Sequence, residues 1–347
     1  MYNAFFGLTD NPFNLSPDPA FLFRSPQHEE ALANLIYGVQ SRKGFIVLTG
    51  EVGTGKTTML ECLRDHLASH EIPFAVLFNS RLTPEQLFEM IAYDFSFGMT
   101  KPSKTDVLFQ LNNMLLERAA AGKTAVLIVD EAQNLSWDVL EEIRLLGNLE
   151  NRRGKLIQII LAGQPELDQK LEEQEYRQLK QRISLRCRLR AFNLQETADY
   201  IASRLARAGM KEQRVFPRVV LEGIQARTAG IPRLINSVCD NLLLTAFAMG
   251  ARVVTPAILE EVAADLQLNL PAPPAPVVTA PAPEPVIAGP VPEPVPVQAV
   301  AASVAPPVAV EEPPAPVVPE PLPVPQLELP AEPKGLLARW FGKAFGK

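Results

Sequence analysis

The chain has 347 residues, more than one ordinary domain, and 47% of them are hydrophobic, enough to bury a sizeable core. Its formal net charge of −6 argues against a generic nucleic-acid-binding protein. The cysteines Cys62, Cys187 and Cys239 lie far apart and form no CxxC pair, which argues against a metal site and favours a reducing compartment.

Residues 1–26 are the predicted N-terminal arm, and within them the segment 8–23 carries prolines at positions 12, 17 and 19 among aromatic residues. Because proline fixes φ and lacks an N–H donor, this segment predicts an extended arm that lies on a domain. The first ten residues lack the basic start and apolar core of a signal peptide, and no stretch reaches the ~18 unbroken apolar residues that span a bilayer. We therefore expect a cytoplasmic protein that is neither exported nor membrane-spanning by its own sequence.

Residues 27–192 alternate between short apolar runs, rich in β-branched residues, and helical patterns. The predicted strands are 45–49, 74–78, 125–129, 156–161 and 184–189, and the predicted helices lie near 27–41, 57–69, 84–95, 106–120 and 137–148. This order predicts an α/β domain with a parallel sheet covered by helices on both faces. Residues 193–270 hold four helical patterns without a strand, which predicts a small all-helical lid domain.

A phosphate-binding motif follows the first predicted strand directly. It matches the pattern G-x-x-x-x-G-K-[ST], and with the next threonine it comprises Gly50, Glu51, Val52, Gly53, Thr54, Gly55, Lys56, Thr57 and Thr58. Its glycines let backbone N–H groups wrap a phosphate at a helix N-terminus, so this segment predicts a P-loop that binds ATP. We expect Lys56 to neutralise the β- and γ-phosphates and the Thr57 hydroxyl to ligate Mg²⁺.

Two carboxylates end the predicted strand 125–129. Asp130 is expected to hold the Mg²⁺ shell and Glu131 to orient and activate the attacking water. Acidic residues after a strand can also cap the next helix, but the upstream phosphate motif favours the catalytic interpretation. Gln164 follows the strand 156–161 and is the candidate sensor of the γ-phosphate or the water, with a simple turn residue as the alternative.

The chain resembles the ExeA/GspA-type AAA+ ATPases associated with bacterial secretion and pilus biogenesis, and it shares features with exopolysaccharide-cluster ATPases and transposition helpers. The matching segments are Phe6–Leu8, Asn11–Phe13, Pro17–Leu22, His28–Leu32, Gly50–Thr58, Asp130–Leu135 and Gly163–Leu167. The resemblance covers roughly residues 1–267. It implies an ATPase that hydrolyses Mg-ATP, with the P-loop NTPase (AAA+) fold.

The resemblance also implies roles for two arginines. Arg233, in the segment Gly230–Arg233, matches the lid sensor that contacts the γ-phosphate, with a helix-end role as the alternative. Arg182 is the best candidate for an arginine finger acting on a neighbour's ATP, with Arg186 second and a basic strand edge as the alternative. A finger in trans implies a homo-oligomer. Phe13 and Pro17 are expected either to cover the adenine or to pack in the core.

Beyond the lid, residues 271–333 hold 22 of the 33 prolines, which predicts a disordered, partly polyproline-II linker. Residues 334–347 then place Leu336, Leu337, Trp340, Phe341, Ala344 and Phe345 on one face of a basic helix. This pattern predicts binding either to an anionic membrane surface or to a groove of a partner protein.

Three functions remain open at this point. The leading one is an ATPase that drives or regulates assembly of an envelope machine of the secretion, pilus or polysaccharide-export type, working at the inner face of the inner membrane with a protein partner. The second is a DNA-associated AAA+ protein, against which the acidic balance argues. The third is a nucleotide-gated scaffold, against which the intact Glu131 argues.

Overall fold

The computed structural model describes residues 2–15, 23–78, 81–100, 102–152, 154–210 and 215–268. Contacts divide the chain into two units, Met1–Val277 and Val278–Lys347, and every described residue lies in the first. The predictions for the linker 271–333 and the terminal helix 334–347 fall outside the described residues. Within the residues that the structure describes, no helix is both long enough and apolar enough to cross a bilayer.

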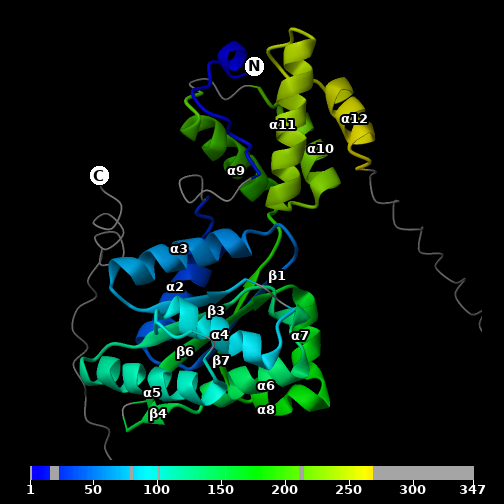
Figure 1. The fold of residues 1–347 in the computed structure, drawn as a ribbon. Helices are drawn as coiled ribbons and strands as arrows, with labels where there is room; N and C mark the ends of the chain where they lie inside the picture. Colours follow the sequence, from blue (N-terminus) through cyan, green and yellow to red (C-terminus); the bar gives the residue numbers. More distant parts are fainter. Residues whose placement is uncertain are drawn as a thin grey trace, which may run out of the picture. The chain divides into compact units, whose positions relative to one another are not determined.

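Five parallel strands form the sheet at the centre of the α/β part, in the order β2-β3-β6-β1-β7 (Figure 1). The strands are β1 (Phe45–Gly50), β2 (Phe74–Leu77), β3 (Ala125–Val129), β6 (Ile157–Gly163) and β7 (Ile183–Leu189). Every residue of β1, β3 and β6 is buried, as expected of strands covered on both faces. The predicted parallel sheet is therefore confirmed. A short antiparallel pair, β4 (Glu150–Asn151) and β5 (Gly154–Lys155), was not predicted.

Helices cover both faces of this sheet, and in Figure 1 α3 and α5 lie on opposite sides of the strands. One hydrophobic cluster packs two helices on the sheet: α2 (Pro26–Gln40) and α3 (Lys56–Ser69). The other cluster packs the opposite face with α4 (Pro84–Asp94), α5 (Lys104–Ala120), α6 (Trp137–Leu146), α7 (Pro165–Glu172) and α8 (Arg177–Lys180). The sheet thus fixes the carboxyl ends of β1, β3 and β6, after which the predicted site residues stand.

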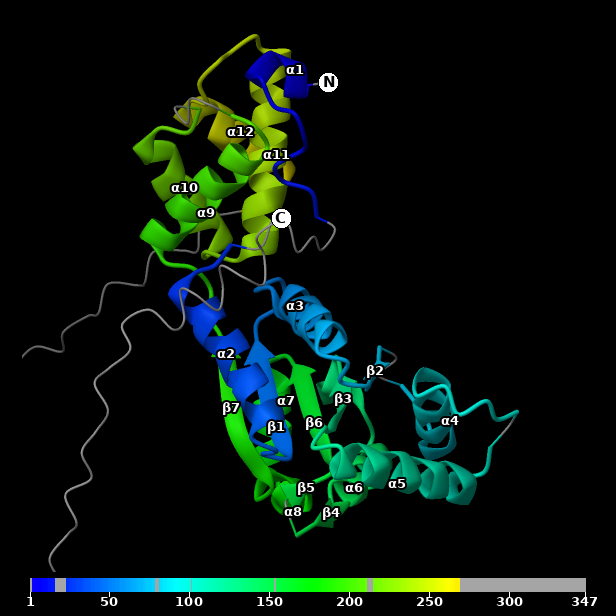
Figure 2. The same ribbon diagram turned by 90° about the vertical axis from the view of Figure 1, so that its left-hand side faces the viewer.

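Four helices lie in the described part of the helical lid, and they correspond to the four predicted patterns. They are α9 (Leu194–Arg207), α10 (Arg218–Thr228), α11 (Pro232–Ala248) and α12 (Pro256–Asp265) (Figure 2). The lid has its own hydrophobic cluster, centred on residues such as Ile235, Leu242 and Val262, which are 0–2% exposed.

The N-terminal arm contributes to this lid cluster. Its short helix α1 (Tyr2–Phe6) lies against α11, and the Tyr2 hydroxyl donates a hydrogen bond to the Asp240 carboxylate. Phe13 is 1% exposed and meets the ring of Phe216 edge-on, so it packs in the lid core rather than over a ligand. Pro17 lies outside the described residues.

Candidate nucleotide-binding site

The phosphate-binding loop joins β1 to α3, and two of its side chains donate hydrogen bonds to carbonyl oxygens of the loop itself. Lys56 is 6% exposed, and its ammonium donates hydrogen bonds to the carbonyl oxygens of Gly50 at 2.7 Å and Glu51 at 3.0 Å. The buried Thr54 hydroxyl donates to the Glu51 carbonyl oxygen at 2.8 Å. Gly55 is the N-cap of α3, with a φ of 102°, and has no side chain to cap the first-turn N–H groups. These groups remain available to an anion.

Burial lowers the pKa of Lys56 below its usual value, and the carboxylates of Glu131 and Asp130 partly oppose this shift. A phosphate group near the ammonium would act in the same direction as these carboxylates, because an opposite charge favours the protonated form. The position therefore suits a lysine that meets an anionic ligand.

Asp130 and Glu131 stand at the end of β3, as the sequence predicts. Asp130 is 8% exposed, and burial raises the pKa of its carboxyl group, although its Oδ1 accepts a hydrogen bond from the Glu131 N–H at 2.9 Å. Glu131 has a left-handed backbone with a φ of 51°. Hydroxyl and carboxylate oxygens are ligands that Mg²⁺ prefers, so the predicted ligands Thr57 and Asp130 carry donor atoms of a type that suits this ion.

Gln164 follows β6 and directs its amide to Glu131. Its Nε2 donates a hydrogen bond of 2.9 Å to Oε2 of Glu131. A second amide, which was not predicted, binds the same oxygen: Nε2 of Gln133 also donates to Oε2, at 2.5 Å. Gln133 lies two residues after Glu131 in the Asp130–Leu135 motif, but this position alone does not indicate a contact with Glu131.

An open cleft of about 200 Å³ lies over this loop. Its lining includes the loop residues 52–58, Glu131, the aromatic side chains Phe23, Phe192 and Tyr200, and the lid residue Arg233. The three rings contact one another at centroid distances of 5.3–5.7 Å. The cleft thus joins a polar phosphate-binding end to an apolar end that suits a nucleobase.

The lid residue Arg233 touches the phosphate-binding loop directly. Its backbone N–H donates a hydrogen bond of 3.2 Å to the Gly53 carbonyl oxygen. A Cβ atom on Gly53 would come within 2.7 Å of the Arg233 Cβ, so a glycine is needed for this approach. The structure therefore brings the predicted lid sensor to the predicted P-loop.

His28 is a site residue that the sequence analysis did not assign. It is 5% exposed; its Nε2 lies 3.2 Å from the Thr54 carbonyl oxygen, and its Nδ1 lies 2.7 Å from the Ser25 hydroxyl. Burial lowers the pKa of the imidazole. Because a carbonyl only accepts, Nε2 carries the proton and donates, which ties α2 to the phosphate-binding loop.

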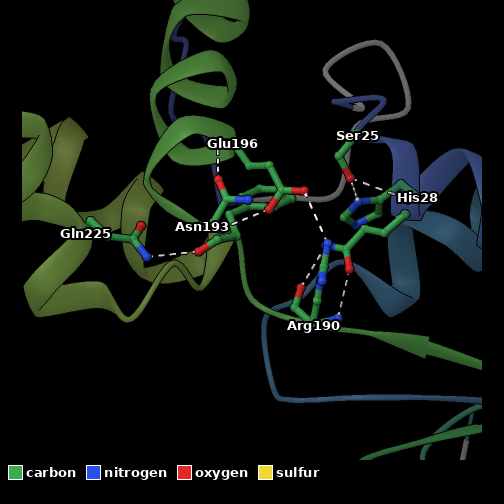
Figure 3. A network of polar contacts seen from close by, with 8 residues as sticks. Ser25, His28, Arg190, Asn193, Glu196 and Gln225 are labelled. Carbon is green, nitrogen blue, oxygen red and sulfur yellow. Dashed lines mark hydrogen bonds and ion pairs between the residues drawn. The ribbon is translucent and has the colours of Figure 1, made fainter.

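A polar network joins the α/β part to the lid at the segment 190–193 (Figure 3). The Gln27 amide pairs with both main-chain groups of Arg190, at 3.0 and 3.2 Å, and the Arg190 guanidinium lies 3.9 Å from the Glu196 carboxylate. Asn193 and Glu196 cap α9 reciprocally, each accepting a backbone hydrogen bond of 2.9 Å. The connection between the two parts is therefore held from both sides.

The two finger candidates lie apart from this cleft. The Arg182 guanidinium donates to the Arg144 carbonyl oxygen at 3.2 Å and to Oδ1 of Asn148, beside α6. Arg186 lies on the edge strand β7, with its Nη1 2.9 Å from Oδ1 of Asp168. Neither is among the described residues that line the cleft. The role of either arginine as a finger for a neighbouring molecule stays a prediction.

A family model described as an AAA domain matches residues 39–171. Together with the sheet order and the phosphate-binding loop, this match identifies residues 39–171 as an AAA domain with the P-loop fold. The chain is also 45% identical, over 255 residues, to General secretion pathway protein A of Aeromonas hydrophila. The alignment covers 73% of this chain and 46% of that protein, so the chain spans less than half of its relative's length. The predicted resemblance to the ExeA/GspA-type ATPases is confirmed.

Solved structures of the same fold are more distant in sequence. Cdc6p from Pyrobaculum aerophilum matches with a TM-score of 0.57 at 20% identity, over 74% of this chain and 71% of that one. The Aeropyrum pernix ORC1 protein, solved in complex with DNA, matches with a TM-score of 0.53 at 18% identity, over 74% and 69% of the two chains. At these identities the likeness shows the fold alone.

Proposed function

We propose that this chain binds and hydrolyses Mg-ATP in the cleft and uses the cycle to drive or regulate assembly of a bacterial envelope machine. The observation that carries the ATPase proposal is that Lys56, Glu131 and Arg233, from three separate segments, line one cleft. The identity to General secretion pathway protein A supports the envelope role. Because the chain spans 46% of that relative, the envelope-machine client of this chain is likewise a proposal.

Each site residue then has a defined role in ATP hydrolysis. The loop N–H groups and Lys56 bind the phosphates of ATP, and Thr57 and Asp130 hold Mg²⁺, which when bound offsets the charge of the phosphates. Glu131 accepts a proton from the attacking water. Arg233 contacts the γ-phosphate and so couples the lid to the nucleotide state.

The partners follow from the same scheme. A second copy of the chain supplies an arginine finger, with Arg182 as the first candidate, and the protein acts at the cytoplasmic face of the inner membrane. Residues 334–347 are proposed to bind its anionic surface. The identity to a secretion-pathway protein favours an envelope protein as the client and not DNA.

The test is phosphate release by the purified full-length chain, measured with Mg-ATP and with Mg²⁺ removed by EDTA. Release that depends on Mg²⁺ and disappears in Lys56→Ala is expected; release no higher than in that variant would show that the chain is not an ATPase. Glu131→Gln protein held in ATP is then tested for co-purification with envelope-machine components. Salt-sensitive DNA binding in place of such components would favour the DNA-associated alternative.

A further inference from the structure

Two glutamine amides hold the same carboxylate oxygen of Glu131. Oε2 accepts hydrogen bonds from Nε2 of Gln133, at 2.5 Å, and from Nε2 of Gln164, at 2.9 Å. The two donors come from different segments, Gln133 from the short helix η2 (Ala132–Asn134) after β3 and Gln164 from the end of β6. Hydrogen bonds to an ionised acceptor are the strong kind, so this pair restrains the carboxylate.

The orientation of the Gln133 amide is fixed by a further contact. Its Oε1 accepts a hydrogen bond of 3.2 Å from the backbone N–H of Gln164. A backbone N–H only donates and an ionised carboxylate only accepts, so the amide satisfies both neighbours in one orientation alone. Gln133 is therefore a bridge between the strand that carries Glu131 and the strand that precedes Gln164.

The surroundings of Gln133 allow it little movement. A Cβ atom on Gly163 would come within 2.6 Å of its Oε1, so the glycine leaves room for the amide in the observed position. The Lys170 ammonium on α7 donates to the carbonyl oxygens of Gln133 at 3.1 Å and Leu135 at 2.5 Å. Both the side chain and the main chain of Gln133 are thus held by the segment that follows β6.

We infer that Gln133 is a positioning residue for ATP hydrolysis that acts through Glu131. This inference rests on the proposed function, in which Glu131 activates the attacking water. Because both amides bind Oε2, they aim the carboxylate and leave Oε1 to take the proton. Glu131 lines the cleft, whereas Gln133 is not among the described residues that do so, so Gln133 influences turnover and not ATP binding.

The experiment compares the full-length wild type with Gln133→Met, which keeps the side-chain length and removes the amide. Gln110, exposed on α5, gives the matched control Gln110→Met. We expect kcat of Gln133→Met to fall on the order of 10-fold to 100-fold, since small misplacements of a catalytic group cost rates of this size. KM and the affinity for a fluorescent ATP analogue stay unchanged, as does the kcat of the control. Gln133→Asn shortens the side chain by one methylene. If the methionine variant does not fold, the asparagine variant replaces it, and the same fall in kcat is expected.

A double variant separates positioning from general structural damage. If Gln133 acts through Glu131, the residual rate of Glu131→Gln/Gln133→Met equals that of Glu131→Gln alone, measured in single turnovers with radiolabelled ATP. A further fall in the double variant would overturn the inference, as would a wild-type or higher kcat in Gln133→Met. Absence of ATPase activity in the wild type would instead refute the proposed function, so the two failures are distinguishable.

Discussion

The backbone N–H of Arg233, in the first turn of α11, donates a hydrogen bond to the carbonyl oxygen of Gly53 in the phosphate-binding loop. This contact puts the N-terminus of the lid helix α11 directly on the loop that would hold the phosphates. Any change in the loop on binding a nucleotide is therefore transmitted to α11 without an intervening side chain.

Lys56→Ala and Glu131→Gln should separate binding from turnover. Lys56→Ala removes the charge that faces the phosphates and should abolish binding of an ATP analogue. Glu131→Gln should bind the analogue normally and lose turnover by ~10²-fold or more, since the amide cannot accept the proton of water. Equilibrium binding and steady-state phosphate release check both, and normal release by either variant would contradict the site assignment.

Gly230→Ala should be strongly destabilising. Gly230 has a φ of 75°, and a Cβ atom there would lie 1.9 Å from the Phe192 carbonyl oxygen, in the connection between the two parts. Gly250 has a φ of 67°, and a Cβ atom added to it would meet no other atom within 4 Å, so Gly250→Ala is a control for backbone strain alone. The control should cost about 1–2 kcal/mol. The loss of unfolding free energy in Gly230→Ala should exceed that in the control by about 1–3 kcal/mol, measured by urea unfolding. Equal losses in the two variants would show that the backbone at Phe192 moves aside without a cost in free energy.

His28→Gln should change how stability depends on pH. Burial lowers the pKa of His28, so the unfolded chain binds more protons than the folded one below the ordinary value of about 6.5. Stability is therefore highest above this pH and falls as the pH decreases through it. The introduced amide would still donate to the Thr54 carbonyl oxygen without titrating. Between about pH 7.5 and about pH 5.5 the variant should lose less unfolding free energy than the wild type; parallel losses would mean that His28 makes no contribution.

Arg182→Ala should lose ATPase activity and regain part of it when mixed with Lys56→Ala. In the mixture each variant supplies the group that the other lacks, and activity should also rise with protein concentration. Asn148→Ala is the control, because Asn148 accepts a hydrogen bond from Arg182 in the same chain. If Arg182 only anchors α6, both variants lose activity alike and mixing restores neither.

The peptide Lys334–Lys347 should sediment with anionic liposomes, since its basic residues and Trp340 suit a lipid interface. Added salt should weaken the binding, and the full-length Trp340→Glu/Phe341→Glu variant should stay in the supernatant. If the peptide and the wild-type protein both remain in the supernatant with strongly anionic vesicles at low salt, the groove of a partner protein becomes the site to seek.

The parallel sheet was predictable because strands such as β1 and β3 consist largely of apolar residues in an unbroken run: the predicted 45–49 and 125–129 differ from β1 and β3 by at most one residue. The loop residues and Asp130 were predictable as well, because local spacing defines them. The strands β4 and β5 have two residues each, too few for a periodic pattern.

Gln133 and His28 could not be assigned from spacing, since their roles depend on contacts between distant segments. Gln133 meets Gln164 across 31 positions, and only because β3 and β6 are neighbours in the sheet. His28 meets Thr54 across 26 positions, through the packing of α2. A glutamine in a turn or a histidine in an amphipathic helix has no sequence pattern that distinguishes such a role from simple packing.

The arm that packs on the lid has a consequence for synthesis on the ribosome. Tyr2 and its partner Asp240 are 238 positions apart, and Phe5 and its partner Arg252 are 247 apart. At about 5–20 residues per second, on the order of 10–50 s pass between translation of the two halves of this contact. The sheet can form during that interval, whereas the aromatic side chains of the arm wait for α11. A chaperone that binds apolar segments on nascent chains would therefore find its substrate in the arm, and the lid would be the last part of the described chain to fold.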